Sequence, residues 1–272
     1  MGEPTDLPDY DYEPKEVAIA PHEKPMGFME HLEDLRWTLV KSALAFTVFA
    51  VLIGVFMKEF NDVLLWPLNH VKADYPQFLL DLGTTSIMEG FTVVIQMCFM
   101  GGLVMSAPFV FFFVGQFVSP ALNERELKLV LPTCIAAFLL FLIGATFSFF
   151  LLVPSTMRVS IELNEMFGFT MRWTPGAYYS LLIWLVLGVG AAFEFPLLIV
   201  LLVFLGFVTT RKLRGWWRHA LLLSFVVAAI VTPTPDPVTQ TSLALPLYGL
   251  YWIAILVASR IEKSKNDEED EV

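Results

Sequence analysis

The chain has 272 residues, of which 56% are hydrophobic and only 16% are charged. Soluble domains usually carry about 25% charged residues and do not collect their apolar residues in long uninterrupted runs. The composition therefore excludes an ordinary soluble domain and indicates an integral membrane protein. The formal net charge is −10 at pH 7, with acidic residues concentrated near the two ends of the chain, and no basic patch suited to nucleic acid is present.

Six apolar runs divide the chain, and a membrane-spanning helix needs about 20 mostly apolar residues. The first four runs are long enough. The fifth is short, and the sixth is also short unless it begins near Thr239. In chain order the runs are 38–57, 91–117, 129–153, 178–207, 220–231 and 243–257. The sequence predicts an all-α integral membrane fold with six transmembrane helices. Its short fifth and sixth spans imply a locally thinned bilayer.

The two short runs could instead form a re-entrant hairpin. Pro233, Pro235 and Pro237 break the chain between them. Basic residues flank the pair, at 211–218 before it and at 260–265 after it. Two spans joined by a tight proline-rich turn place both basic clusters on one side of the membrane, so two spans are favoured.

The loop charges predict the orientation. With the N-terminus in the cytoplasm, only Lys58, Lys72, Arg158 and Arg172 lie outside, which leaves 13 of the 17 basic residues in cytoplasmic segments. The positive-inside rule favours this arrangement. The sequence therefore predicts that both ends of the chain are cytoplasmic.

The two segments predicted to lie outside have features of their own. Residues 61–89 are long enough to pack as a small cap. The second outer segment is 153–176. In it and directly after it, Trp173 and the pair Tyr178 and Tyr179 are expected to anchor the chain at the membrane interface, where such residues are enriched.

The sequence contains no enzyme motif of the HExxH, GxSxG, Walker A or GxGxxG type. The four histidines are not at metal-ligand spacing. Cys98 and Cys134 lie inside apolar runs without a CxxC pair or a disulfide framework. We therefore expect no catalytic residue, no metal site and no cofactor.

Glu194 is an acid inside the fourth predicted span. A carboxylate at membrane depth is costly and usually functional, although a buried acid that only hydrogen-bonds a neighbouring helix is the alternative. Pro196 removes a backbone hydrogen bond and predicts a kink at this point. An acid at a kink could hold a polar cavity within the bilayer.

Acidic residues also gather on the face predicted to be cytoplasmic. Residues 29–36 form an amphipathic segment before the first span, and residues 117–126 form the first cytoplasmic loop. Each segment alone could be an interfacial helix or a plain turn. Together they carry five acids that could receive a cationic ligand. These acids are Glu30, Glu33, Asp34, Glu124 and Glu126.

The proline-rich segment 232–240 joins the fifth and sixth spans. Asp236 and Gln240 share a helix face if the sixth helix begins at Pro237. On spacing alone, a capped tight turn is the simpler interpretation.

Six of these segments, in order, resemble the motifs of the TatC family, the polytopic subunit of the twin-arginine protein translocase. The resemblance extends from residue 26 to about residue 260. Its motifs are His31-Leu32-Glu33-Asp34-Leu35-Arg36, Glu89-Gly90-Phe91, Phe117-Val118-Ser119-Pro120-Ala121-Leu122 with Glu126, Phe193-Glu194-Phe195-Pro196, Thr232-Pro233-Thr234-Pro235-Asp236-Pro237 with Gln240, and Leu245-Pro246-Leu247-Tyr248.

The resemblance implies a concave, glove-like membrane domain over residues 26–260, between a cytoplasmic tail at 1–25 and an acidic cytoplasmic tail at 261–272. It also implies a receptor and core subunit in a prokaryotic plasma (inner) membrane. Such a subunit binds the twin-arginine signal peptides of folded proteins and supports their export, driven by the proton-motive force. Its implied partners are single-span subunits of the TatA or TatB type and further copies of itself.

The resemblance implies roles for particular residues. Its signal-peptide-binding positions fall on Asp34, Arg36, Phe117, Pro120, Leu122 and Glu126. Its buried carboxylate is Glu194, and its partner-docking region includes Asp236, Gln240, Pro246 and Tyr248. Carboxylates suit the first role because they bind guanidinium groups through charge-assisted hydrogen bonds.

The sequence departs from the family's usual pattern in three places. Leu127 and Lys128 follow the loop glutamate where basic residues are common, Trp252 stands where an acid is common, and Asp34 replaces the commoner glutamate.

Two other functions fit the sequence less well. A proton-coupled secondary transporter would use Glu194 as its titrating site, yet no repeat relates the first three spans to the last three. A purely structural membrane scaffold would leave the cytoplasmic acids unexplained.

Overall fold

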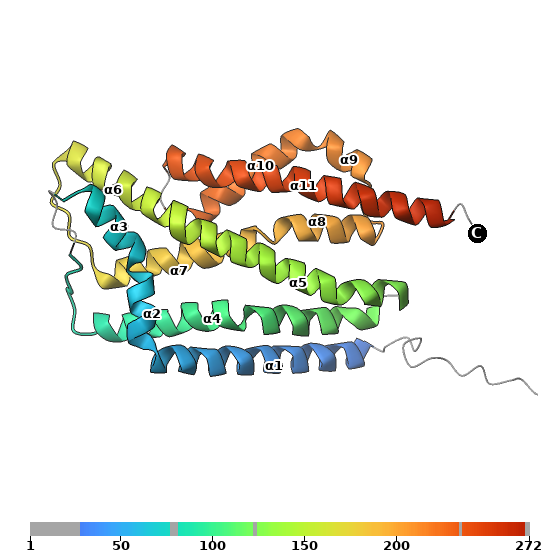
Figure 1. Cartoon of the computed structure of the whole chain (residues 1–272), viewed down its shortest axis with the longest axis horizontal. Coiled ribbons are helices and arrows are strands. Elements are labelled where there is room, and N and C mark those ends of the chain that lie inside the picture. Colours follow the sequence, from blue (N-terminus) through green and yellow to red (C-terminus); the bar gives the residue numbers. More distant parts are fainter. Residues whose placement is uncertain (1–27, 77–80, 122–123, 234–235, 270–272) are drawn as a thin grey trace, which may run out of the picture.

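The structure is a computed structural model that describes residues 28–76, 81–121, 124–233 and 236–269. All regular secondary structure in these ranges is helical, and the long helices run roughly along one axis (Figure 1). The predicted all-α fold is confirmed. The predicted N-terminal tail, residues 1–25, lies outside the described residues.

The first two spans are α1 (Phe28–Val55) and α4 (Glu89–Val118). Two glycines of α4 let the helices approach closely. A Cβ atom on Gly101 would lie 2.8 Å from Cγ1 of Ile53, and one on Gly102 would lie 3.0 Å from Cβ of Ala50. Small residues allow this approach between membrane helices. The rest of α1 is largely uncovered, as only 6% of its most apolar window is buried.

The third span is longer than the bilayer requires. It consists of α5 (Glu124–Phe147), the π-helical turn η2 (Ser148–Leu152) and α6 (Val153–Phe167). The apolar stretch Leu129–Phe167 has 39 residues, which is about 58 Å at 1.5 Å per residue. Most of the segment predicted as the second outer loop is therefore helix α6, which projects beyond the hydrocarbon core.

The fourth span is interrupted where the sequence predicts a kink. It consists of α7 (Pro175–Ala192) and α8 (Phe195–Phe204), with Pro196 in the first turn of α8. At the break, the Glu194 N–H donates to the carbonyl of Ala191 at 3.1 Å. The interruption is therefore sharp but keeps its backbone groups bonded.

The last part of the chain forms α9 (Thr210–Gly215), α10 (Trp217–Val231) and α11 (Pro237–Glu269). Helix α10 has 15 residues and is short, as predicted. Helix α11 is longer than predicted, because its apolar stretch Pro237–Lys263 has 27 residues. The sequence-based run begins at residue 243, after the polar residues of the segment 237–242. The structure shows that these residues are helical and form the start of α11. The prediction of a locally thinned bilayer therefore rests on α10 alone.

The cap predicted for residues 61–89 is present. Helix α2 (Met57–Leu64) turns across the bundle, and α3 (Trp66–Asp74) packs against α6 (Figure 1). Arg158 of α6 pairs with Asp74 at 2.7 Å, and Lys72 pairs with Asp81 at 2.5 Å. We call this end of the bundle the cap end.

The opposite end holds both the start of α1 and the end of α11 (Figure 1). The end of α4, the start of α5 and helix α9 also lie there. We call it the tail end. Both described ends of the chain thus lie on one side of the bundle, as the predicted topology requires.

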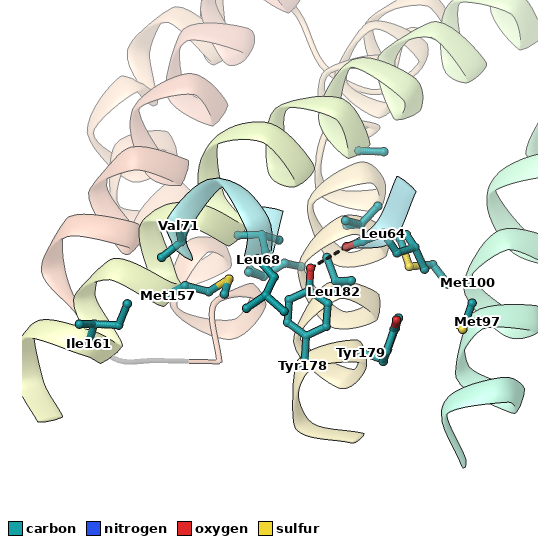
Figure 2. Close-up of a cluster of buried hydrophobic side chains, with 14 residues drawn as sticks. Leu64, Leu68, Val71, Met97, Met100, Met157, Ile161, Tyr178, Tyr179 and Leu182 are labelled. Atoms are coloured by element: carbon teal, nitrogen blue, oxygen red, sulfur yellow. Dashed lines mark hydrogen bonds between the residues drawn. The ribbon is translucent and has the colours of Figure 1, made fainter. Parts of the chain in front are cut away.

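Tyr178 and Tyr179 are not interfacial anchors, contrary to the sequence-based expectation. Each is 4% exposed and lies in a hydrophobic cluster with Leu64, Leu68 and Leu182 (Figure 2). The Tyr178 hydroxyl donates to the carbonyl of Leu64 at 2.6 Å, and the Tyr179 hydroxyl donates to Oδ1 of Asn61. The two tyrosines therefore attach the cap to α7.

Replacement of Tyr178 tests this attachment. Tyr178→Phe leaves the buried carbonyl of Leu64 without its donor, so we expect a loss of about 1–3 kcal/mol of stability. Thermal unfolding of the purified protein in detergent would measure it. The control is Tyr75→Phe, because the Tyr75 hydroxyl donates to Glu162 at 3.3 Å in an exposed position. Equal melting temperatures for the two variants would contradict the role of Tyr178.

Candidate functional site

The first group of predicted site residues lies at the tail end, where α1 begins and α4 ends. The rings of His31 and Phe117 stack there, with centroids 4.4 Å apart and planes inclined by 21°. The sequence predicts both segments as binding elements but does not predict that they touch. The structure therefore joins the acidic start of α1 to the first loop.

Asp34 and Arg36 occupy different faces of α1. Asp34 follows His31 by three residues, so it lies on the face that carries the stack, and it is half-buried. Arg36 follows by five residues, which turns it about 140° around the helix, and it is exposed. No ion pair joins either residue to another described residue. Both charges remain available to a ligand.

The first loop follows α4 as the 3₁₀ turn η1 (Ser119–Ala121). The Ser119 hydroxyl donates to the carbonyl of Gln116 at 2.8 Å, and Pro120 is exposed. Leu122 lies outside the described residues, as does the side chain of Glu126, whose backbone belongs to the first turn of α5. The loop therefore presents Pro120 beside the stacked Phe117.

A close contact joins α4 and α5 near the first loop. The Cys134 thiol on α5 donates to the carbonyl of Phe111 on α4 at 3.3 Å. A Cβ atom on Gly115 would collide with the same sulfur atom. Cys134 is thus a small packing residue, as the sequence indicates, and it sets how closely α4 and α5 approach beside the loop.

Glu194 lies at the break between α7 and α8, near the middle of the long axis of the bundle (Figure 1). Its Oε1 atom is buried and has no hydrogen-bond partner among the described residues. The Oγ atom of Ser148, in the π-helical turn η2, is likewise buried without a hydrogen-bond partner among the described residues. The two residues flank one aromatic contact, since the rings of Phe147 and Phe193 have centroids 5.8 Å apart.

Two glycines draw α5 and α7 together next to Glu194. A Cβ atom on Gly144 would lie 2.7 Å from Cγ of Phe193, and one on Gly190 would lie 2.7 Å from Cε2 of Phe141. The acid is therefore held at a tightly packed, apolar helix crossing. A polar oxygen left unpaired in such a place is costly, which favours a functional role.

The turn between α10 and α11 is capped, as the simpler interpretation of its sequence predicts. Asp236 is 8% exposed, and its Oδ1 atom accepts the N–H of Thr239 at 2.6 Å. Pro237 occupies the first position of α11. The Gln240 side chain donates to the carbonyl of Phe225 on α10 at 3.2 Å. Asp236 therefore caps the start of α11, and Gln240 links α11 to α10.

Pro246 and Tyr248 lie further along α11 and are half-buried. The Tyr248 ring stacks on Tyr251 and meets Trp252 edge-on, with centroids 6.4 and 6.3 Å apart. The residues predicted for partner docking thus form two groups on α11, one at its first turn and one near its middle.

Glu89 has a role that the sequence does not reveal. Its carboxylate accepts the N–H of Thr85 at 2.8 Å and the N–H of Gly176 at 3.1 Å. It therefore ties the first outer segment to the start of α7. The sequence shows an acid at the first residue of a membrane helix, which is a signal for a functional or structural role. It does not show that this acid accepts a hydrogen bond from Gly176, because Gly176 lies in a distant segment.

The family model for "Sec-independent protein translocase protein (TatC)" matches residues 30–246. The chain belongs to the TatC family. The TatC protein of Helicobacter pylori is 34% identical over 245 residues, which cover 88% of this chain and 90% of that protein. The TatC protein of Koribacter versatilis is 34% identical over 241 residues, which cover 86% of each chain.

A solved structure agrees with the assignment to TatC. The crystal structure of the twin arginine translocase receptor TatC in DDM superposes with a TM-score of 0.71 at 29% identity. The match covers 84% of this chain and 99% of that one. The chain is thus a multi-pass membrane component of Sec-independent protein translocation, and its relatives are named as translocase components rather than as enzymes.

Replacement of Gly190 tests the crossing that holds Glu194. Gly190→Ala forces the Phe141 ring to move, and we expect a loss of about 1–3 kcal/mol through overpacking. The matched control is Gly249→Ala in α11, because a Cβ atom there meets nothing within 4 Å. Thermal unfolding in detergent would compare them. Equal stability of the two variants would contradict the tight crossing.

Proposed function

We propose that this chain is the receptor and core subunit of a twin-arginine translocase in a prokaryotic plasma membrane. It binds the twin-arginine signal peptides of folded proteins. With single-span partners of the TatA or TatB type, it supports their export, driven by the proton-motive force. The observation that carries the proposal is the stack of His31 on Phe117, which brings two predicted binding segments together.

The chemistry of the tail end suits a pair of guanidinium groups. Asp34 lies on the stacked face of α1, and Glu126 lies in the first turn of α5, directly after the loop. Carboxylates bind guanidinium groups through short bidentate hydrogen bonds that an ammonium group does not reproduce. We include Arg36, Pro120 and Leu122 in the proposed binding surface because they lie in the family's motifs.

We place the tail end in the cytoplasm. The outer cations Lys72 and Arg158 are engaged in ion pairs at the cap end. The exposed basic residues of α9 and the start of α10 lie at the tail end. The positive-inside rule depends on Lys and Arg in short loops, and their distribution supports this orientation.

We assign Glu194 to assembly or transport rather than to the first recognition of the peptide. The break that carries it lies well inside the bundle, away from the tail end (Figure 1). Its unpaired Oε1 atom can be satisfied by a proton or by a donor from a partner helix. Partner helices dock along α11, at Asp236 and Gln240 and at Pro246 and Tyr248.

The subunit also assembles with further copies of itself in the receptor complex. The largely uncovered surface of α1 supports this part of the proposal, since the helix contacts the rest of the described chain mainly through α4. Such a surface is available to another membrane helix.

A proton-coupled secondary transporter that titrates Glu194 is the other candidate, and the unpaired Oε1 atom is the observation that favours it. A pull-down with a twin-arginine peptide and its twin-lysine variant separates the two functions. Arginine-dependent binding supports the receptor alone, and equal or absent binding of both peptides contradicts it.

Replacement of Phe117 or Glu126 tests the binding surface. We expect Glu126→Ala to weaken twin-arginine peptide binding roughly tenfold or more, because a hydrogen bond to a charged group contributes about 1.5–3 kcal/mol. We expect Phe117→Ala to weaken it as well, because the change removes the ring that stacks on His31 and joins the two binding segments. Photo-crosslinking of a labelled peptide would measure this. Phe112→Ala is the control, because Phe112 is exposed on the same helix. Undiminished crosslinking in both test variants would remove the basis of the proposal.

Replacement of Glu194 tests the later step. We expect Glu194→Ala to bind the peptide normally but to lose most export activity. Glu165→Ala is the control, because Glu165 is exposed on α6. Export of a folded reporter and peptide crosslinking would be measured on the same membranes. Normal export by Glu194→Ala would leave this acid with a structural role only.

A further inference from the structure

The chain makes a basic, aromatic elbow at the tail end, between the fourth and fifth spans. We define the elbow as residues 210–219, which comprise α9, Trp216 and the start of α10. We propose that the elbow binds the phosphate headgroups of anionic phospholipids and so anchors this end of the bundle in an anionic leaflet. This site is separate from the peptide-binding surface at Phe117.

The cations of the elbow are not neutralised by the protein. Arg211, Lys212, Arg214 and Arg218 are all exposed. Within the described ranges, no ion pair joins any of them to a carboxylate. At the cap end, by contrast, Lys72 and Arg158 are paired with Asp81 and Asp74. Free Lys and Arg side chains next to a membrane attract anionic lipids, each by about 1 kcal/mol.

The aromatic residues set the depth of the elbow. Trp216 and Trp217 are 56% and 41% exposed, and they lie between α9 and the start of a membrane helix. The Arg218 guanidinium carbon is 5.1 Å from the centroid of the Trp217 ring, within the range of a cation–π contact. Exposed tryptophans at the end of a span are typical of the headgroup level. This placement favours a lipid over a protein in the aqueous phase.

The elbow is held rigidly against α11. Leu213 is 8% exposed and packs in a cluster with Tyr251 and Ile255, and the Tyr251 hydroxyl donates to the carbonyl of Leu213 at 2.6 Å. The Glu262 carboxylate accepts the N–H of Thr210 at 3.2 Å and also its hydroxyl.

Glu262, the acid that contacts the elbow, is thus engaged with Thr210 rather than with a cation. One side of α9 is fixed against the protein, while Arg211, Lys212 and Arg214 remain on the exposed side. A preorganised set of cations loses little conformational freedom when it binds a headgroup.

Native mass spectrometry of the purified full chain tests the proposal. The probes are phosphatidylglycerol, phosphatidylcholine and soluble glycerol 3-phosphate. We expect a preference for phosphatidylglycerol over phosphatidylcholine. We also expect a reduction of roughly thirtyfold in phosphatidylglycerol affinity for Arg211→Gln/Arg214→Gln, because two charges at about 1 kcal/mol each are lost. The charge-preserving variant Arg211→Lys/Arg214→Lys should keep most of the affinity.

The matched control removes two exposed cations elsewhere. Lys58 and Arg172 lie in the segments at the cap end, and Lys58→Gln/Arg172→Gln changes the net charge equally. It should retain the preference for phosphatidylglycerol. Equal losses in the two double glutamine variants would overturn the proposal, because net charge alone would then explain the binding.

Two further arms exclude other occupants. Displacement of phosphatidylglycerol by soluble glycerol 3-phosphate at equal concentration would show a simple phosphate site and overturn the lipid assignment. A synthetic peptide of the chain's acidic residues 264–272 is the second competitor. Displacement by that peptide would show that the elbow serves the C-terminal segment instead, and absence of displacement supports the lipid site.

Discussion

The requirement that every backbone polar group be bonded inside the hydrocarbon region controls this structure. It limits the spans to helices, and it allows a helix to break only where the freed groups find partners. The break at Glu194 keeps its backbone bonds through Ala191, and the turn before α11 is closed by the Asp236 cap. Two buried polar side chains without a hydrogen-bond partner among the described residues, Glu194 and Ser148, also lie at irregular points, Ser148 being in the π-helical turn. The position of Glu194, the candidate functional acid inside the membrane, therefore follows from where the fourth span is interrupted.

The two ends of the bundle differ in how their polar groups are used. At the cap end several of them form internal bonds, as in the Arg158–Asp74 pair and the link from Glu89 to Gly176. At the tail end, Asp34 and the cations of the elbow have no ion pair among the described residues. A closed, internally bonded end suits a rigid frame, whereas an end with free charges suits ligands. Recognition of a basic peptide and contact with anionic lipid both belong at the tail end on this reasoning.

Tight helix crossings give the intramembrane acid its position. Gly144 and Gly190 bring α5 and α7 close enough for aromatic rings to fill the space that side chains at these positions would occupy. In lipid there is little hydrophobic force between helices, so close packing of small residues supplies much of the attraction. The same contacts that stabilise the bundle thus keep the unpaired oxygen of Glu194 beside a tightly packed crossing.

The sequence by itself determined the membrane class, the six spans, the kink before Pro196 and the capped turn at Asp236, because hydrophobic runs, proline and a capping acid act locally. The ordered motifs also determined the family. Only the tertiary structure decided that His31 stacks on Phe117, that Tyr178 and Tyr179 fasten the cap, and that Glu89 reaches Gly176. It also decided the lengths of α6 and α11, since polar or mixed segments can continue a helix that hydropathy ends. These features depend on contacts between residues far apart in the chain, and hydropathy and local propensity carry no information about such contacts.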